Sequence, residues 1–253
     1  MKQSNNQSPK WKFTPWQIIQ GFEGLLVMGA CYLTWFLKPL RDRWGLSREE
    51  ANRPLPGDDI VKAPKSKYSH GIQIDAPVEY VWPWVVQMGK SRGGFYSYEA
   101  LENVIGLDIY NVDEILKKYQ DPKVGEIIPF GPDSGYPLAL VKKNEAMVIE
   151  SCDDLELKLN FDPGVGYPNK YLHISWLWYI EPIGVHKSRF ISRNRVDFSD
   201  GRMNRLKFSI LAEPMVFAMD RKMCLGLKKR AEQYYKSAGS STLGLDQQLN
   251  TAS

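Results

Sequence analysis

The segment Gly71–Leu101 constrains the fold of this chain more than any other stretch. It opens with alternating apolar and polar residues, which is the period of a half-buried strand. Pro77 follows, and proline is tolerated in the first turn of a helix, where its missing N–H would be unpaired in any case. The next apolar residues fall largely on one helical face. Gly89 ends that helix, and Gly93–Tyr98 leads into an aromatic cluster. The segment therefore predicts a strand, a helix, a glycine turn and an aromatic cluster in that order.

Two long strands and a long helix are predicted in the C-terminal half. Every even position of Tyr171–Pro182 from Leu172 to Ile180 is apolar, which predicts a strand with one wholly apolar face. His186–Phe198 predicts a second strand, and Pro214–Lys236 predicts a helix with apolar residues three or four positions apart. Shorter strands are expected at Glu126–Phe130, Tyr136–Lys142, Ala146–Ser151 and Leu155–Asn160, and short helices at Tyr98–Ile105 and Val112–Tyr119.

One set of residues in these segments forms a recognisable pattern: Ile74, Ala76, Pro77, Glu79, Val81, Trp82, Trp84, Gln87, Met88, Gly89, Gly93–Tyr98, Glu213–Met215 and Leu227–Glu232. This pattern resembles that of the SRPBCC superfamily, also called START-like or Bet v 1-like, which includes polyketide cyclase/dehydrase-type proteins. The resemblance covers roughly Arg53–Lys236, and its lead-in Arg53–Asp59 resembles a membrane-linked bacterial branch. It implies an α+β helix-grip fold, in which a curved antiparallel sheet of about six or seven strands surrounds a long C-terminal helix.

The N-terminal segment Trp16–Leu37 is about as long as a helix that spans a bilayer. Trp16 and Trp35 suit the two membrane interfaces, whereas Glu23 inside the span is costly. We expect a transmembrane helix here; the alternatives are an amphipathic helix on a membrane surface and one docked on the main domain. More Lys and Arg residues follow the span than precede it, which predicts a single-pass protein with its main domain in the cytoplasm.

The predicted organisation has five parts. They are a tail at residues 1–15, a transmembrane helix at 16–37, a mostly irregular linker at 38–66, the START-like domain at 67–236 and a polar, disordered tail at 237–253. The net charge of +4 is too small to indicate nucleic-acid binding. Three distant cysteines provide no disulfide framework.

A sheet curved around a helix leaves a concave apolar cavity of the kind that holds small molecules. Aromatic and methionine side chains on the faces that meet there are the candidates for ligand contact, although large apolar residues more often only fill a core. The candidate ligand-binding residues are Trp82, Tyr96, Tyr98, Trp176, Trp178, Asn194, Met219 and Met223.

Catalytic chemistry has weaker support in the sequence. A carboxylate near a tyrosine in an apolar cavity can act as a general acid or base if burial raises its pKa. The alternative is that these groups are solvated or bonded within the domain. His70, His173 and His186 show no metal-type spacing with each other or with the cysteines, so no metal is predicted, and no motif indicates a cofactor. The polar candidates are Tyr96, Tyr98, Glu102, Asp108, Ser192, Arg193, Asn194 and Arg195.

Three hypotheses about function follow. The first is a membrane-anchored domain that binds a hydrophobic or lipid-like small molecule, and the second is a cyclase- or hydrolase-like enzyme that uses the same cavity. The third is a membrane-tethered module with a filled core that binds a protein partner, which the sequence does not identify. An open cavity without converging polar groups favours the first, a buried carboxylate or histidine at its floor favours the second, and a filled core favours the third.

Overall fold

The computed structural model describes residues 14–132, 134–156, 159–160, 162–201, 206, 210 and 212–251. Its strands are β1 (Ser66–Ile74), β2 (Ile127–Pro129), β3 (Gly135–Lys142), β4 (Ala146–Asp154), β5 (Leu159–Asn160), β6 (Tyr171–Gly184) and β7 (Lys187–Phe198). Its helices are α1 (Pro15–Leu33), α2 (Lys38–Arg41), α3 (Arg48–Asn52), α4 (Val78–Val86), α5 (Glu99–Val104) and α7 (Glu213–Thr251), with 3₁₀ turns η1 (Trp35–Leu37) and η2 (Lys117–Tyr119).

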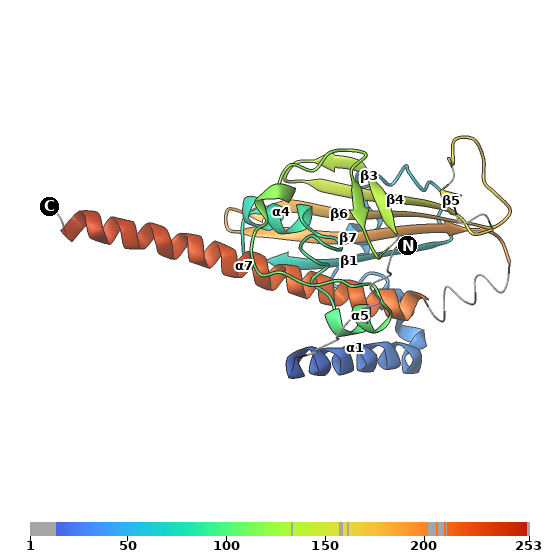
Figure 1. Ribbon diagram of the computed structural model, residues 1–253, viewed down its shortest axis with the longest axis horizontal. Helices are drawn as coiled ribbons and strands as arrows, with labels where there is room; N and C mark the ends of the chain where they lie inside the picture. The colour runs from blue at the N-terminus through green and yellow to red at the C-terminus, as the bar shows by residue number, and fades with distance from the viewer. Residues whose placement is uncertain are drawn as a thin grey trace, which may run out of the picture.

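The strands form one antiparallel sheet around the long helix α7. Their order is β1-β7-β6-β4-β3-β2, and β5 pairs with β4. Figure 1 shows α7 running along one face of the sheet, with α5 and then α1 on the side of α7 away from it. This arrangement is the α+β helix-grip fold. Its core lies between the sheet, α4 and α7, and includes Val85, Met147, Trp178 and Leu227.

The β6–β7 pair sets the two faces of the sheet. Trp176 of β6 lies opposite Asn194 of β7, so the even positions of both strands share one face, and Ser192 on this face bonds to Asp220 of α7. Because side chains alternate along a strand, the neighbours His173 and Arg193 lie on the outer face. The apolar face predicted at the even positions of Tyr171–Pro182 is confirmed, since Trp178 and Ile180 belong to the core.

Residues 38–66, expected to form a linker, pack against the domain: Asp42 and Trp44 bond to the edge strand β1, and the part from Leu46 onward covers the outer face of the sheet. Leu46 and Leu55 join Leu177 of the sheet in a second apolar cluster. The guanidinium group of Arg193 is buried beneath this segment, where it pairs with Asp58 at 2.7 Å and donates to backbone carbonyls of residues 50–53. Apolar side chains and a buried arginine that needs acceptors explain why the segment is held on the domain.

Two local predictions differ from the structure. The helix expected at Val112–Tyr119 is reduced to η2, because the buried amide of Gln87 bonds to the backbone there: Gln87 Oε1 accepts from Leu116 N at 2.8 Å and Nε2 donates to Glu114 O at 3.0 Å. Helix α7 continues to Thr251, through most of the tail expected to be disordered. That tail contains no proline and several residues that favour helices.

The N-terminal region forms a bent helix pair and not one continuous helix over Trp16–Leu37. Arg41 Nη1 donates to the carbonyls of Cys31 and Thr34 at 2.7 and 3.0 Å, and so caps the end of α1. Among the described residues, no single helix is both long and apolar enough to cross a bilayer. Pro15–Leu33 and Trp35–Arg41 meet that criterion only together, and they are bent by 91°.

Candidate functional site

A cavity of about 560 Å³ lies between the sheet and the helices. Its lining is mainly apolar, and four separate parts of the fold supply it. The sheet contributes Tyr68, Tyr136, Ile149, Ser151, Asp153, Leu172, Ile174, Trp176 and Asn194, and α7 contributes Met215, Val216, Met219, Asp220 and Met223. Helix α5 and the adjoining segments add Phe95, Ser97, Leu101, Glu102, Val104, Ile105, Leu107, Ile109 and Phe130, and α1 adds Leu25 and Met28.

The cavity opens beside α1. Four of its lining residues are also strongly exposed apolar side chains: Leu25, Val104, Ile105 and Met215. They come from α1, from α5 and its C-terminal end, and from the start of α7. A ligand would therefore enter past an apolar rim, of which α1 forms one side.

Glu102 is a buried carboxyl group in the cavity wall. It lies on α5, its side chain is nearly inaccessible, and its Oε2 atom has no hydrogen-bond partner among the described residues. Burial raises the pKa of Glu102 to about 8, and the nearby carboxylate of Glu99 adds to this shift. Glu102 is therefore mostly a neutral carboxylic acid at pH 7, with a proton to donate.

Asn194 brings a second unpaired polar atom to the cavity from the opposite, sheet side. Its Nδ2 atom is buried and has no hydrogen-bond partner in the described part of the chain. The other charged residues that line the cavity are Asp153 and Asp220, and no Lys, Arg or His is among the described lining residues. The ionisable groups of the cavity are thus acidic or phenolic.

Asp220 is the centre of a buried polar network near the N-terminal end of α7. Its Oδ1 accepts from Ser192 Oγ at 2.7 Å, and its Oδ2 is hydrogen-bonded to His70 Nδ1. Ser192 in turn accepts from Trp176 Nε1 at 2.8 Å. The network links β1, β6, β7 and α7, so that a buried carboxylate next to the cavity has both oxygens satisfied.

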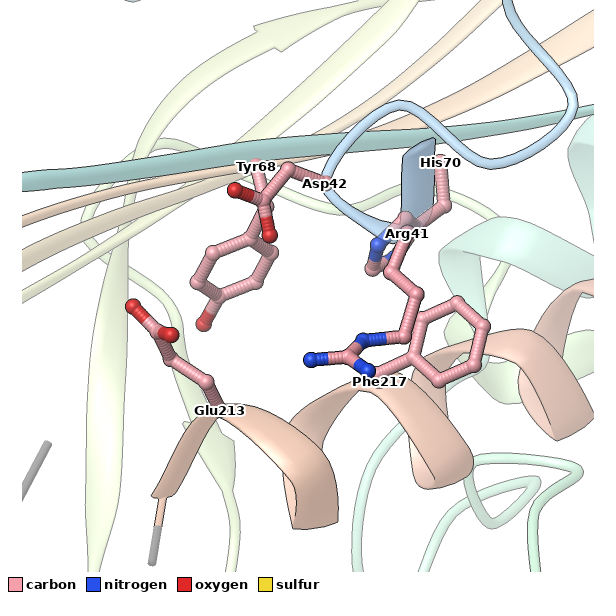
Figure 2. A pocket seen from close by; sticks show the side chains of 6 residues that line it. All are labelled: Arg41, Asp42, Tyr68, His70, Glu213 and Phe217. Atoms are coloured by element: carbon pink, nitrogen blue, oxygen red, sulfur yellow. The ribbon is translucent and has the colours of Figure 1, made fainter. Parts of the chain in front are cut away.

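A very small second pocket lies on the other side of Tyr68. Figure 2 shows the ring of Tyr68 near the carboxylates of Asp42 and Glu213, with Arg41, His70 and Phe217 completing the lining. Its volume is about 10 Å³, which is at most enough for one water molecule. This pocket therefore offers no room for an organic ligand.

The structure separates the predicted ligand-binding residues into two sets. Trp176, Asn194, Met219 and Met223 line the cavity. Trp82, Tyr96 and Trp178 are packed in the core, and Tyr98 is buried where α1 crosses α5. Contact of the first set with a ligand remains a prediction, and the second set does not line the cavity.

The polar candidates also divide between different places. Arg193 and Arg195 lie on the outer face of the sheet and bind the segment at residues 50–62. The hydroxyl of Tyr96 donates to the Trp84 carbonyl at 2.9 Å and does not reach the cavity. Asp108 pairs with Lys90 at 3.3 Å, half-exposed. Glu102 and Asn194 are the candidates with unpaired atoms at the cavity, whereas Ser192 supports Asp220.

One cluster on the outer face of the sheet contains metal-ligand side chains that linear spacing did not reveal. Cys152 and His173 are cross-strand partners on β4 and β6. Glu150 Oε1 accepts from His173 Nε2 at 2.9 Å and from Cys152 Sγ at 3.4 Å. Sulfur, imidazole and carboxylate are zinc ligands, so these three residues could hold a metal. In this structure they are hydrogen-bonded to one another, and the Tyr167 hydroxyl bonds to the other ring nitrogen of His173.

Comparisons with known proteins give distant likenesses. No protein-family model and no curated protein matches the chain. A hypothetical protein from Helicobacter pylori is 10% identical, with a TM-score of 0.41 over 70% of this chain and 95% of that one. Norcoclaurine synthase from Thalictrum flavum is 12% identical, with a TM-score of 0.36 over 73% of this chain and 94% of that one. The Zhui aromatase/cyclase from Streptomyces sp. R1128 is 11% identical, with a TM-score of 0.32 over 69% of this chain and 98% of that one.

Proposed function

We propose that this protein binds a hydrophobic or lipid-like small molecule in the cavity between the sheet and α7, at a membrane surface. The observation that carries this proposal is the apolar cavity of about 560 Å³. Pockets for small molecules are concave and mostly apolar, with a few polar groups that fix orientation. Met219 and Met223 add flexible side chains that adapt to the shape of a ligand. An open cavity of this size also argues against the hypothesis of a filled core.

Helix α1 supplies the membrane contact in this proposal. Its inner side is docked: Gly21 and Gly24 are buried, and Glu23 pairs with Lys222 of α7 at 2.7 Å. Its outer side exposes large apolar side chains that no described residue covers. An amphipathic helix bound at a membrane lies in the plane of its surface, with the apolar face among the lipid chains. The exposed residues are Trp16, Ile18, Ile19, Phe22, Leu25, Leu26, Tyr32 and Leu33.

The position of α1 connects membrane contact with ligand binding in this proposal. Leu25 belongs both to the exposed side of α1 and to the cavity lining. With α1 in the membrane surface, the apolar rim of the cavity would face the lipid chains, and a ligand would pass between membrane and cavity with little exposure to water. The bent geometry of α1 and η1 replaces the straight span as the form of the anchor.

The ligand proposal is tested by native mass spectrometry and lipid extraction of the full chain purified from its own cells. We expect a defined hydrophobic compound to copurify. Ile174→Trp, which fills the cavity, should abolish copurification, whereas Ile183→Trp, at an exposed position of the same strand, should leave it intact. Empty wild-type protein that also takes up no added lipid would refute ligand binding.

The membrane proposal is tested by carbonate extraction and liposome flotation. We expect the full chain to float with liposomes and to be released by alkaline carbonate, as an in-plane helix allows and a spanning helix does not. Phe22→Glu with Leu26→Glu should abolish flotation, because charges would replace exposed apolar contacts on α1. The matched control is Val165→Glu with Val185→Glu, two strongly exposed positions away from α1.

Acid–base catalysis in the same cavity is a second candidate function. The observation that favours it is that Glu102, a carboxyl group with a raised pKa, lines the cavity from α5, and that Asp220 lines the same cavity from α7. A carboxyl group that carries a proton in an apolar cavity suits general acid catalysis of ring closure or hydrolysis. The test is whether the copurified compound is converted by wild-type protein and left unchanged by Glu102→Gln.

A further inference from the structure

The polar groups of the cavity restrict which class of ligand it can bind, given the binding function proposed above. Two residues that line it each carry a buried polar atom, Glu102 Oε2 and Asn194 Nδ2, that has no hydrogen-bond partner among the described residues. A buried polar group without a partner is costly and uncommon in folded proteins. A ligand that bonds to both atoms would remove that cost, which makes them the recognition points for its polar part.

Both groups act as donors. Asn194 Nδ2 is an amide nitrogen and can only donate a hydrogen bond, and a neutral carboxylic acid at Glu102 donates through its O–H. Several other polar groups of the lining are already engaged within the protein: Ser97 Oγ donates to the Met219 carbonyl at 3.0 Å, Ser151 Oγ donates to Asp153 at 2.6 Å, and Asp220 accepts from Ser192 and His70. The ligand must therefore present oxygen atoms that accept.

The charges around the cavity restrict the ligand further. The lining includes the carboxyl groups of Asp153 and Asp220 in addition to Glu102, and no cationic side chain among the described residues. A carboxylate or phosphate brought into this wall would lose its hydration and meet no positive partner, which makes its entry unfavourable. We propose that the cavity selects an uncharged amphiphile, with hydroxyl or ester oxygens that accept hydrogen bonds from Glu102 and Asn194, and that it excludes ionised fatty acids and other anionic lipids.

Three probes with the same hydrocarbon chain test this selectivity: 1-monoolein, oleate and oleylamine. Delipidated full-length protein is mixed with the three in equal amounts at pH 7, and native mass spectrometry measures the occupancy by each. We expect monoolein to occupy the cavity at least ten times more than either charged probe. Leu substitutions, Glu102→Leu and Asn194→Leu, should each reduce monoolein occupancy about tenfold, which corresponds to about 1.4 kcal/mol.

Two further variants distinguish a loss of ligand binding from a loss of folding. Glu102→Gln keeps a neutral donor of the same size, and we expect it to retain monoolein within a few-fold. Glu79→Leu, at an exposed position on α4, should change nothing. Thermal unfolding of each variant identifies any that fails to fold.

The possible results distinguish a failure of the proposed selectivity from a failure of the binding function on which it rests. Occupancy by oleate or oleylamine equal to or above that by monoolein would overturn the selectivity and leave hydrophobic binding intact. Monoolein occupancy that is unchanged in both Leu variants would overturn the assignment of Glu102 and Asn194. Absence of all three probes from the wild-type cavity would overturn both the inference and the proposed function.

Discussion

Gly24 of α1 lies directly against Leu101 of α5. A Cβ atom at Gly24 would stand 2.6 Å from Leu101 Cδ1, and 3.0 Å from the Tyr98 ring. Contacts this short are not accommodated without movement, so the absence of a side chain at Gly24 is what lets α1 approach the domain. Because α1 also forms one side of the cavity rim, this single contact couples the anchor to the ligand site.

Substitution of Gly24 by Val should therefore loosen α1. We expect a loss of about 1–3 kcal/mol in the docking of this helix, in the range found for overpacked cores. Hydrogen exchange should increase in α1 and α5 and stay unchanged in β6 and β7. The matched control is Gly29→Val on the same helix, where an added Cβ meets nothing within 4 Å. Equal effects of the two variants would contradict the docking argument.

Stability should depend on pH through Glu102. Its pKa is about 8 in the folded chain against an ordinary value of 4.5, so the folded state retains a proton that the unfolded chain loses above pH 4.5. Stability from this group is therefore complete at low pH, falls as pH rises from about 4.5 to 8, and levels off above 8. Glu102→Gln should flatten that decline, and at pH 9 it should be more stable than wild type by a few kcal/mol.

Urea denaturation at pH 5–9 measures this effect. Glu99 on the same helix is the charged group that adds to the shift, and Asp220 of α7 lines the same cavity. Glu79→Gln, an exposed carboxyl group on α4, serves as the control and should leave the decline in place. A wild-type slope that persists in Glu102→Gln would show that another group causes it.

The network around Asp220 should contribute to stability independently of ligand. Asp220→Leu would leave Ser192 and His70 without their buried acceptor, and we expect a loss of about 1–3 kcal/mol for each group that it leaves unpaired. Urea denaturation at constant pH provides the measurement. Asp121→Leu, at a strongly exposed position, should have little effect.

Two tryptophans on the same strand should behave differently. Trp178 is fully buried in the core and does not line the cavity, so Trp178→Ala should cost about 3–5 kcal/mol of folding stability. Trp176 lines the cavity and is only partly buried, so Trp176→Ala should cost less and should instead weaken ligand binding. Thermal unfolding and ligand occupancy, measured on both variants, distinguish the two roles.

Much of the fold could be predicted from local patterns. The alternation in β6, the proline and glycine boundaries of α4 and the apolar face at the start of α7 follow from backbone geometry, which each short segment carries in itself. The same patterns failed where a distant side chain intervened. Gln87 holds the backbone at residues 114–116 in a non-helical form. Arg41 caps α1, which ends at Leu33 before the bend. Neither contact can be recognised from the local sequence.

The sequence by itself determined which residues point toward α7, because side-chain alternation along a strand needs no other part of the chain. Only the tertiary structure decided which of them meet open space, why Trp176 lines the cavity while Trp178 fills the core, and why Glu102 has a raised pKa. It also decided that Cys152 meets His173 across β4 and β6. Volume, desolvation and cross-strand pairing are set by elements far apart in the chain, so no local pattern contains them.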